Sequence, residues 1–270
     1  MKPIFGIISP VNLEIVNSKE REQFVSKRLI VKIGSSTIVK DGDPLNRDFM
    51  DNMARQISGL FRSGVEVVIV SSGAVACGRK ILGDIGTTTL DNQVAAVYGQ
   101  PELIAQWKAS FSRYGVHVGQ ELLTDEHLNN NRKVLEDSLK RGVVIINAND
   151  PVNDLEMKQF RISADNDRLA GDVAGSIDAD TLILLTDVDG VLNKKGELLT
   201  HVDRLEDVED IIKDSGAGTG GMWSKCLVAK QAARDGRRSI IANGRSEDVI
   251  LRAARGQNVG TRFIPGYMFY

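Results

Sequence analysis

The chain has 270 residues, of which 42% are hydrophobic and 26% are charged, and its formal net charge at pH 7 is −2. This composition is typical of a globular protein with a large core, and it offers no basic excess for binding nucleic acid or an anionic membrane. No apolar run reaches the roughly 18–20 residues that span a bilayer, so we expect no membrane partner. Two cysteines, Cys77 and Cys226, are too few for a metal cluster or a disulfide framework, which favours a reducing, cytoplasmic location.

Residues 1–27 are interpreted as an N-terminal extension, followed by a domain over residues 28–270. The short apolar patches of this segment are interrupted by Pro3, Pro10 and Glu14, and it lacks the continuous apolar stretch and cleavage site of a signal peptide. A chain of this length fits one large α/β domain as well as two smaller domains.

Short β-branched runs that are apolar throughout recur along the domain. Such runs predict strands of a parallel sheet that is covered on both faces. They are Leu29–Ile33, Val65–Val70, Val143–Ile146, Thr181–Leu185 and Ser239–Ala242. The alternation of apolar residues within Gly115–Leu123 is compatible with a further strand.

Helical patterns lie between these strands. Within Arg47–Ser63, the residues predicted to share one face are Met50, Met53, Ala54, Ile57 and Leu60. Within Asn92–Tyr114, the corresponding residues are Val94, Val97, Leu103, Ile104 and Trp107. The alternation continues with Asp165–Ser176, Val208–Asp214 and Ser224–Asp235. Strands and helices in alternation predict a doubly wound α/β sandwich.

Polar or glycine-rich turns follow the predicted strands. The carboxyl ends of parallel strands are where ligands bind in such folds, so these turns are candidate binding segments. They are Gly34-Ser35-Ser36, Ser71–Ala74, Asn147–Asp150, Thr186–Gly190 and Asn243-Gly244. Turns are polar in most proteins, which accounts for part of the pattern without any ligand.

Two lysines beside glycine-rich segments indicate a phosphate site. Lys32 lies within an apolar run, where burial is costly unless the ammonium is paired or faces a ligand; an edge lysine that reaches solvent is the alternative. Gly218–Lys225 places three glycines ahead of a lysine and a helical pattern, so its N–H groups can surround phosphate oxygens. A flexible surface loop also fits this segment, and the spacing is not that of a Walker loop.

The remaining polar candidates have simple structural alternatives. Asp165-Asn166-Asp167 opens a helical pattern, where it can cap the helix, hold lysines in place or carry a metal. Thr186-Asp187 is equally well explained as a turn. The three histidines, His117, His127 and His201, have no motif context. Chemistry without a general base is therefore favoured, such as phosphoryl transfer to a carboxylate that is already ionised near neutral pH.

Taken together and in this order, the segments resemble the amino acid kinase family, and within it the glutamate 5-kinase subfamily. The resemblance covers roughly residues 28–264 and rests on Val31–Ser36, Val70–Ala74, Gly99-Gln100, Tyr114–Gln120, Asn147–Asp150, Asp165–Leu169, Leu185–Gly190 and Gly218–Lys225. It implies a three-layer α/β/α sandwich with a mainly parallel central sheet. It also implies a substrate-binding N-terminal part and a C-terminal part that binds ATP with Mg²⁺. The RNA-binding-like PUA domain that many bacterial members carry is expected to be absent.

The resemblance also implies site residues. Lys32 and Lys225 would flank the transferring phosphoryl group, and Asp167 would orient both lysines. Nucleotide and phosphate contacts would come from Gly34, Thr186, Asp187, Gly220, Gly221, Met222 and Lys225. The acceptor amino acid would be held by Ser72, Gly73, Asn130, Asn149 and Asp150, and no protein residue would be a dedicated metal ligand.

The implied activity is phosphorylation of the γ-carboxylate of L-glutamate, the first step of proline biosynthesis, by a homodimer or homotetramer. Departures from the family pattern lie on the acceptor side: Ala148 replaces a glutamate, Lys133 stands where an acidic or amide residue is expected, and Pro151 follows Asp150. Two alternatives therefore stay open. One is a family member that acts on another small acid. The other is a regulatory protein that binds nucleotide without catalysis, which would not need both lysines.

Overall fold

A central sheet organises the molecule in the computed structural model, which describes residues 24–39, 42–123, 130–148, 150, 166–209 and 221–264. The sheet has eight strands in the order β3-β4-β2-β1-β5-β7-β8-β6. Their bounds are β1 Arg28–Ile33, β2 Glu66–Ser71, β3 Val118–Leu123, β4 Val143–Ala148, β5 Thr181–Thr186, β6 His201–Val202, β7 Arg238–Asn243 and β8 Thr261–Phe263. All neighbouring strands pair in parallel except β7 and β8, so the predicted, mainly parallel sheet is confirmed.

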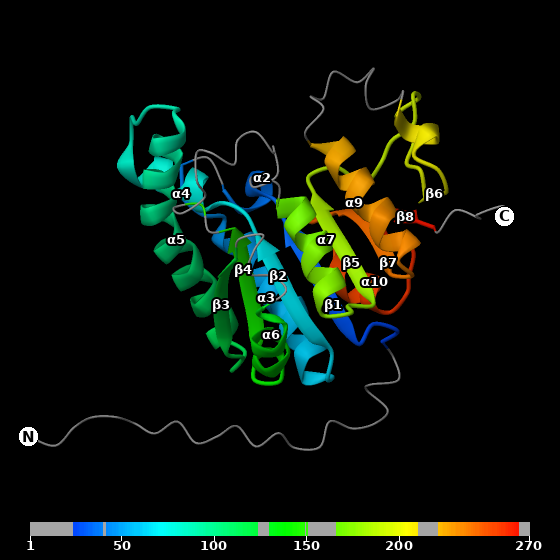
Figure 1. Cartoon of the computed structure of the whole chain (residues 1–270), viewed down its shortest axis with the longest axis horizontal. Helices are drawn as coiled ribbons and strands as arrows, with labels where there is room; N and C mark the ends of the chain where they lie inside the picture. The colour runs from blue at the N-terminus through cyan, green and yellow to red at the C-terminus, as the bar shows by residue number, and fades with distance from the viewer. Residues whose placement is uncertain are drawn as a thin grey trace, which may run out of the picture.

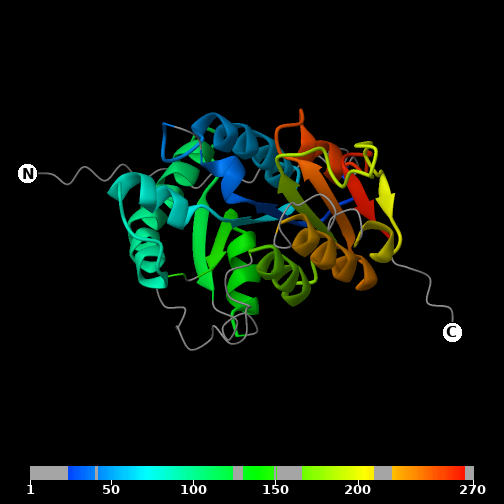
Figure 2. The same cartoon turned by 90° about the horizontal axis from the view of Figure 1, so that it is seen from above.

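Helices cover both faces of the sheet (Figures 1 and 2). Their bounds are α2 Ser35–Ile38, α3 Arg47–Arg62, α4 Ala74–Leu82, α5 Thr89–Ser112, α6 Arg132–Leu139, α7 Asn166–Ser176, α9 Met222–Arg234 and α10 Val249–Ala254. Residues 206–209 form a further helical turn at the start of the predicted Val208–Asp214 helix, whose remainder lies outside the described residues. Helices α3, α5 and α10 share one hydrophobic core with the sheet, and α6, α7 and α9 share the other. The three-layer α/β/α sandwich is thereby confirmed.

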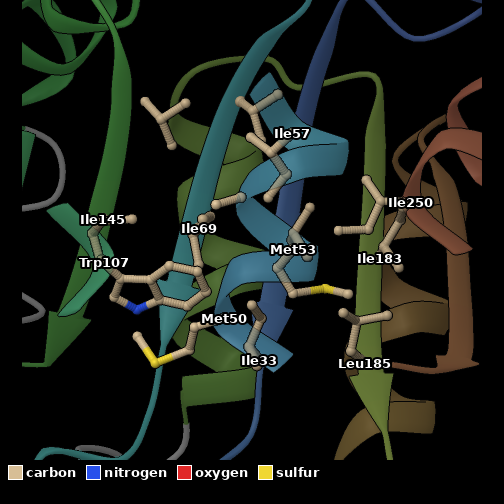
Figure 3. Packing of buried hydrophobic residues seen from close by; sticks show 14 of the residues in the cluster. Ile33, Met50, Met53, Ile57, Ile69, Trp107, Ile145, Ile183, Leu185 and Ile250 are labelled. Carbon is tan, nitrogen blue, oxygen red and sulfur yellow. The ribbon is translucent and has the colours of Figure 1, made fainter. Parts of the chain in front are cut away.

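The predicted apolar face of α3 packs against the sheet. Met50, Met53, Ala54, Ile57 and Leu60 are all fully buried. Figure 3 shows Met50, Met53 and Ile57 lying between side chains from β1, β2 and β5. Burying these apolar side chains stabilises the packing of α3 on the sheet.

The buried face predicted for α5 is correct in the second half of the helix and wrong in the first half. Leu103 and Trp107 are fully buried, but Val94 and Val97 are 41% and 53% exposed. The reason is that the first half of α5 packs on α4 rather than on the sheet, and it does so through small residues. A Cβ added to Gly99 would stand 1.9 Å from the carbonyl oxygen of Ala74, and one added to Gly78 would stand 1.8 Å from that of Ala95. The two helices are therefore in backbone contact, which turns the valines toward solvent.

This contact leads to a testable prediction for Gly99→Ala. The added methyl group would meet backbone atoms of α4, which cannot move aside as a side chain can, so we expect a loss of about 1–3 kcal/mol or more in the free energy of unfolding. Urea unfolding measures it. Gly119→Ala in β3 is the control, since a Cβ there has nothing within 4 Å. Equal stability of the two variants would contradict the backbone contact.

A buried lysine fixes α9 against the far edge of the sheet. Lys230 is 2% exposed, and its ammonium donates to the carbonyl oxygens of Asp203 and, at 2.5 Å, Ile264. Burial lowers the pKa of this ammonium. The helical pattern of α9 was predicted, but nothing in the sequence marked this lysine as an interior one.

The chain enters the domain beside α10. The backbone N–H of Val25 donates to the carbonyl oxygen of Ala254 at 3.0 Å, and Arg255 lies 5.4 Å from the ring centre of Phe24. Residues 1–23 lie outside the described part of the chain, so the boundary placed after residue 27 remains a prediction. None of the helices in the described ranges combines the length and apolarity needed to cross a membrane.

Candidate active site

The predicted site residues meet at the carboxyl edge of the sheet. Strand β1 is central, with β2 and β4 on one side of it and β5 and β7 on the other. Lys32 in β1 lies in register with Val70 of β2 and Leu184 of β5. Gly34, Ser72 and Thr186, which end or follow these three strands, are therefore brought side by side although they are far apart in the sequence.

The centre of this edge is a carboxylate shared by two lysines. Lys32 Nζ lies 2.6 Å from Asp167 Oδ1, and Lys225 Nζ lies 3.0 Å from Asp167 Oδ2. The side chains of Lys32, Lys225 and Asp167 are 7%, 13% and 4% exposed. Because they come from β1, α9 and α7, the lysines approach the carboxylate from different elements. Asp167 therefore contacts both lysines, and its role in orienting them stays a prediction.

The charge of this cluster indicates its ligand. Two ammonium groups and one carboxylate leave a net positive charge at a site with little solvent to screen it. Asp167 lies in the first turn of α7, where a carboxylate also interacts favourably with the helix dipole. Lys225 makes a further 3.3 Å hydrogen bond to the carbonyl oxygen of Gly221, at the start of its own helix. An anion placed between the ammonium groups would complete the charge balance.

On the β5 side, exposed polar groups surround the ends of two strands. Thr186 Oγ1 donates to Asp187 Oδ1 at 3.2 Å, and the side chain of Asp187 is exposed. Asn243, at the end of β7, donates from Nδ2 to Asp189 Oδ1 at 2.9 Å and so fixes the turn that follows β5. Gly221 is the N-cap residue and Met222 the first residue of α9, a helix that packs against β5 and β7. Gly220 and the rest of the predicted loop before it lie outside the described residues.

On the β2 side, small and amide residues form the edge. Gly73 precedes α4 with φ +111°, a conformation that favours glycine. Ser72 Oγ accepts a 2.9 Å hydrogen bond from Asn166 Nδ2, and the same nitrogen donates to Asn147 Oδ1 at 3.2 Å. Asn147 also donates to Gln100 Oε1 at 2.8 Å. Ser72, Asn147, Asn166 and Gln100 are uncharged hydrogen-bonding side chains, in contrast to the lysine cluster beside them.

Comparison with known proteins agrees with this geometry. The family model described as "Amino acid kinase family" matches residues 27–243. The chain belongs to the amino acid kinase family. It is 40% identical over 256 residues to the glutamate 5-kinase of Shewanella amazonensis, 38% over 256 residues to that of Thermoanaerobacter sp., and 36% over 259 residues to that of Caldanaerobacter subterraneus. Each match covers 88% of this chain. The chain spans 66% of the length of the first of these relatives and 68% of the other two.

Several residues predicted from the family pattern are less well placed. Asn130 is exposed just before α6, and Asn149 lies outside the described residues. Lys133 is exposed in the first turn of α6 and lies near Asp137. The pKa of Asp137 is lowered mainly by its hydrogen bond to Lys140, with a smaller contribution from Lys133. The roles of Asn130 and Asn149 in binding remain predictions, and Lys133 remains a departure from the family pattern.

Asp150 has an unusual environment for a carboxyl group. Burial raises its pKa from 3.8 to about 6, because a carboxylate is less stable away from water. The carboxyl group therefore titrates close to neutral pH. Carboxyl groups with a raised pKa are found preferentially at functional sites, which fits the predicted binding position of Asp150.

Sequence reasoning missed the side-chain roles of Asn147, Asn166 and Gln100, although each stands in a segment that carries the family resemblance. One signal was available for Asn147: a polar residue at the end of an apolar strand is expected to be hydrogen-bonded when buried, and it is 1% exposed. Gln100 carried no such signal. Its partner is 47 residues away in the sequence, and only the fold brings them together.

Within the described ranges, no group of three or more histidine, cysteine or acidic side chains is placed to hold a metal ion. Both thiols are free and buried, and burial raises the pKa of Cys77 to about 11 and of Cys226 to about 12. Neither thiol is therefore ionised near neutral pH, and neither serves as a nucleophile there.

Proposed function

We propose that this chain phosphorylates the γ-carboxylate of L-glutamate with ATP, which yields L-glutamyl 5-phosphate, the first step of proline biosynthesis. The observation that carries the proposal is the pair of lysines held by Asp167 at the carboxyl edge of the sheet. The names of the relatives support glutamate as the acceptor. A binding protein without catalysis would have no use for two ammonium groups on opposite sides of one buried carboxylate.

The residues at this edge suit a direct transfer. The acceptor carboxylate is already ionised, so an oxygen lone pair forms the new bond to phosphorus while the bond to the leaving ADP oxygen breaks. Lys32 and Lys225 stabilise the negative charge that spreads over the transferring group, and Asp167 holds both ammonium groups in position. The first turn of α9 and the Gly73–α4 junction add backbone N–H groups near the phosphates.

ATP and Mg²⁺ fit the groups that the chain provides. ATP supplies the phosphoryl group, and Mg²⁺ is bound in such sites largely by phosphate oxygens and water. Asp167 is engaged by both lysines, so it is poorly suited as a metal ligand. We propose that Thr186, Asp187, Gly220, Gly221 and Met222 contact the nucleotide. Asp189, held by Asn243, lies in the same turn.

An alternative acceptor is favoured by two observations, Ala148 in place of a glutamate and Lys133 in place of an acidic or amide residue. The discriminating experiment is ADP release by the purified protein with Mg²⁺, ATP and a panel of small acids that includes glutamate, aspartate, N-acetylglutamate and carbamate. Glutamate as the acid with the highest kcat/KM supports the proposal. A higher kcat/KM with another acid would identify that acid as the acceptor in place of glutamate. Nucleotide binding without turnover of any acid would favour a regulatory protein.

Asp150 provides a pH-dependent prediction. We propose that its carboxylate binds the ammonium group of the acceptor, which requires the ionised form. Because the pKa is raised to about 6, protonation as the pH falls through that value should lower kcat/KM for glutamate. Asp150→Asn should have a lower kcat/KM near neutral pH and should lack this acid limb.

The folding stability that Asp150 contributes changes with pH in the opposite direction to its effect on kcat/KM. The folded pKa lies above the unfolded value, so the stability that this group contributes is present below 3.8 and is lost as the pH rises through about 6. Asp150→Asn should therefore be at least as stable as the wild type near neutral pH. A pH profile of kcat/KM that keeps the same acid limb in Asp150→Asn would contradict the proposed role of Asp150 in binding the acceptor.

We also propose that the protein is a homo-oligomer in a reducing, cytoplasmic compartment. An exposed apolar stripe on α5 supports self-association: Leu90 is 64% exposed, and Val94, Val97 and Tyr98 are 41%, 53% and 53% exposed. The two unpaired thiols fit a reducing compartment. Light scattering at micromolar concentration tests the first part, and a strictly monomeric protein would contradict it.

A further inference from the structure

A chain of hydrogen bonds crosses the acceptor side of the site and joins α5, β4, α7 and the turn that follows β2. It begins at Gln100 on α5, whose Oε1 accepts from Asn147 Nδ2 at 2.8 Å. Asn147 Oδ1, at the end of β4, accepts from Asn166 Nδ2 at 3.2 Å. Asn166, the first residue of α7, also donates to Ser72 Oγ at 2.9 Å. We call these four side chains the amide relay.

One backbone group fixes the direction of every bond in the amide relay. The N–H of Ala148 donates to Asn147 Oδ1 at 2.9 Å, and a backbone N–H can only donate. The oxygen of the Asn147 amide must therefore face Ala148 and Asn166, and its nitrogen must face Gln100. Asn166 in turn must present its nitrogen to Asn147. Ala148 stands where the family pattern has a glutamate, but this hydrogen bond does not depend on the side chain, because the backbone N–H makes it.

The direction of the amide relay decides what Ser72 can do. Its oxygen accepts from Asn166, so its hydroxyl hydrogen is free to point to another acceptor. Among the described residues, no acceptor is hydrogen-bonded to this hydroxyl. Ser72 is also next to the lysine cluster, since its backbone N–H donates to the carbonyl oxygen of Ile33, the neighbour of Lys32. An ionised carboxylate, which only accepts hydrogen bonds, is the group that this hydroxyl suits.

We propose that the amide relay fixes the Ser72 hydroxyl as a donor to the reacting carboxylate of the acceptor, with Gln100 as the positioning residue at its far end. The inference rests on the proposed function, and it adds a reason why the site selects a carboxylate over a carboxamide. A carboxamide NH₂ at the same place would face the donor hydroxyl with a second donor. Asn147 Nδ2 is buried, so loss of Gln100 removes its acceptor and allows the amide to reorient.

The close helix contact described above explains how Gln100 reaches this position. Gly99 allows α5 to touch the backbone of α4 at Ala74, directly after Ser72-Gly73. The residue that follows Gly99 is thereby brought to the end of β4. The Gly99-Gln100 pair then has two distinct tasks, one in helix packing and one in orienting the amide relay.

Three variants on α5 test the proposal. Gln100→Leu removes the acceptor for Asn147, Gln100→Glu keeps an acceptor oxygen, and Gln106→Leu is the control. Gln106 donates to Ser110 on the same helix and does not join the amide relay. Steady-state kinetics give KM for glutamate, KM for ATP and kcat, and inhibition by glutamine reports selectivity for the carboxylate. Thermal unfolding checks that each variant is folded.

We expect Gln100→Leu to raise KM for glutamate about tenfold with KM for ATP changed less than about twofold, and to reduce the preference for glutamate over glutamine. Gln100→Glu should stay within about threefold of the wild type, and Gln106→Leu within about twofold. If Gln100→Leu does not fold, Ser72→Ala must show the same loss of preference. Unchanged KM and unchanged preference in the folded variants would overturn the proposal.

Failure of the proposed function gives a different result. In that case the wild type itself does not phosphorylate glutamate, whatever the variants do. The same variants are then compared by calorimetry for the affinity of the small acid that the wild type turns over or binds. A tenfold loss of affinity for this acid that is confined to Gln100→Leu would support the proposed role of the amide relay. Equal affinities in all variants would overturn it.

Discussion

Replacing Lys225 by alanine is expected to lower kcat by about a hundred- to a thousandfold while the protein stays folded. The reason is that Lys225 supplies one of the two ammonium groups that face the shared carboxylate, and the charge on a transferring phosphoryl group is greatest in the transition state. Loss of an interaction made mainly in the transition state lowers kcat and kcat/KM together and leaves KM for glutamate nearly unchanged. ADP release under saturating ATP measures the effect.

The control for Lys225→Ala is Arg234→Ala, which removes an exposed cation from the last turn of the same helix. It should change kcat less than about twofold, because a solvated charge at that distance is screened. Thermal unfolding of both variants shows whether the fold is kept. A kcat near the wild-type value for a folded Lys225→Ala would show that this lysine has no transition-state role.

The second large effect is expected for Asp167→Asn. This change keeps the shape of the side chain but leaves Lys32 and Lys225, whose side chains are 7% and 13% exposed, without their shared counter-charge. Breaking a buried ion pair in this way costs about 3–5 kcal/mol of unfolding free energy. We also expect kcat to fall, since neither ammonium group is then held in place. Because a bound phosphate would partly replace the lost negative charge, ATP should stabilise this variant more than it stabilises the wild type.

Asp172→Asn provides the matched control on α7. Asp172 pairs with Arg168 one turn away at 3.4 Å, and both side chains are more than 40% exposed. A solvent-exposed pair of this kind contributes less than about 1 kcal/mol. Urea unfolding should therefore separate the two variants clearly. Equal stabilities would contradict the view that Asp167 balances the charges of two lysines.

The sequence predicted the sheet well because its strands are buried on both faces and read as unbroken apolar runs. The same reasoning located Lys32, since an ammonium group within such a run needs a partner or a ligand. The outward turn of Val94 and Val97 was not predictable in this way. An apolar helix face does not reveal whether a sheet or a neighbouring helix will cover it, and the glycines that decided the matter at Gly78 and Gly99 are compatible with several packings.

The residues of the site could be predicted from the sequence, but the details of the contacts between them could not. The family pattern predicted Lys32, Asp167 and Lys225 as catalytic and Asp167 as the residue that orients both lysines, but the carboxylate oxygen that each ammonium group contacts required the fold. The amide relay is a clearer example of contacts that the sequence does not predict. Its direction depends on the backbone N–H of Ala148, and no side-chain pattern encodes where a backbone group will point.

The most direct test of the account is to trap the product of the wild-type protein. An acyl phosphate reacts with hydroxylamine to form a hydroxamate, whereas an unreacted carboxylate does not. With ATP, Mg²⁺, glutamate and hydroxylamine, the account predicts γ-glutamyl hydroxamate in an amount equal to the ADP released. The same mixture with Lys225→Ala should form about a hundred- to a thousandfold less per unit time. ADP release by the wild type without any hydroxamate would contradict the account, because the phosphoryl group would then be going to an acceptor other than the carboxylate.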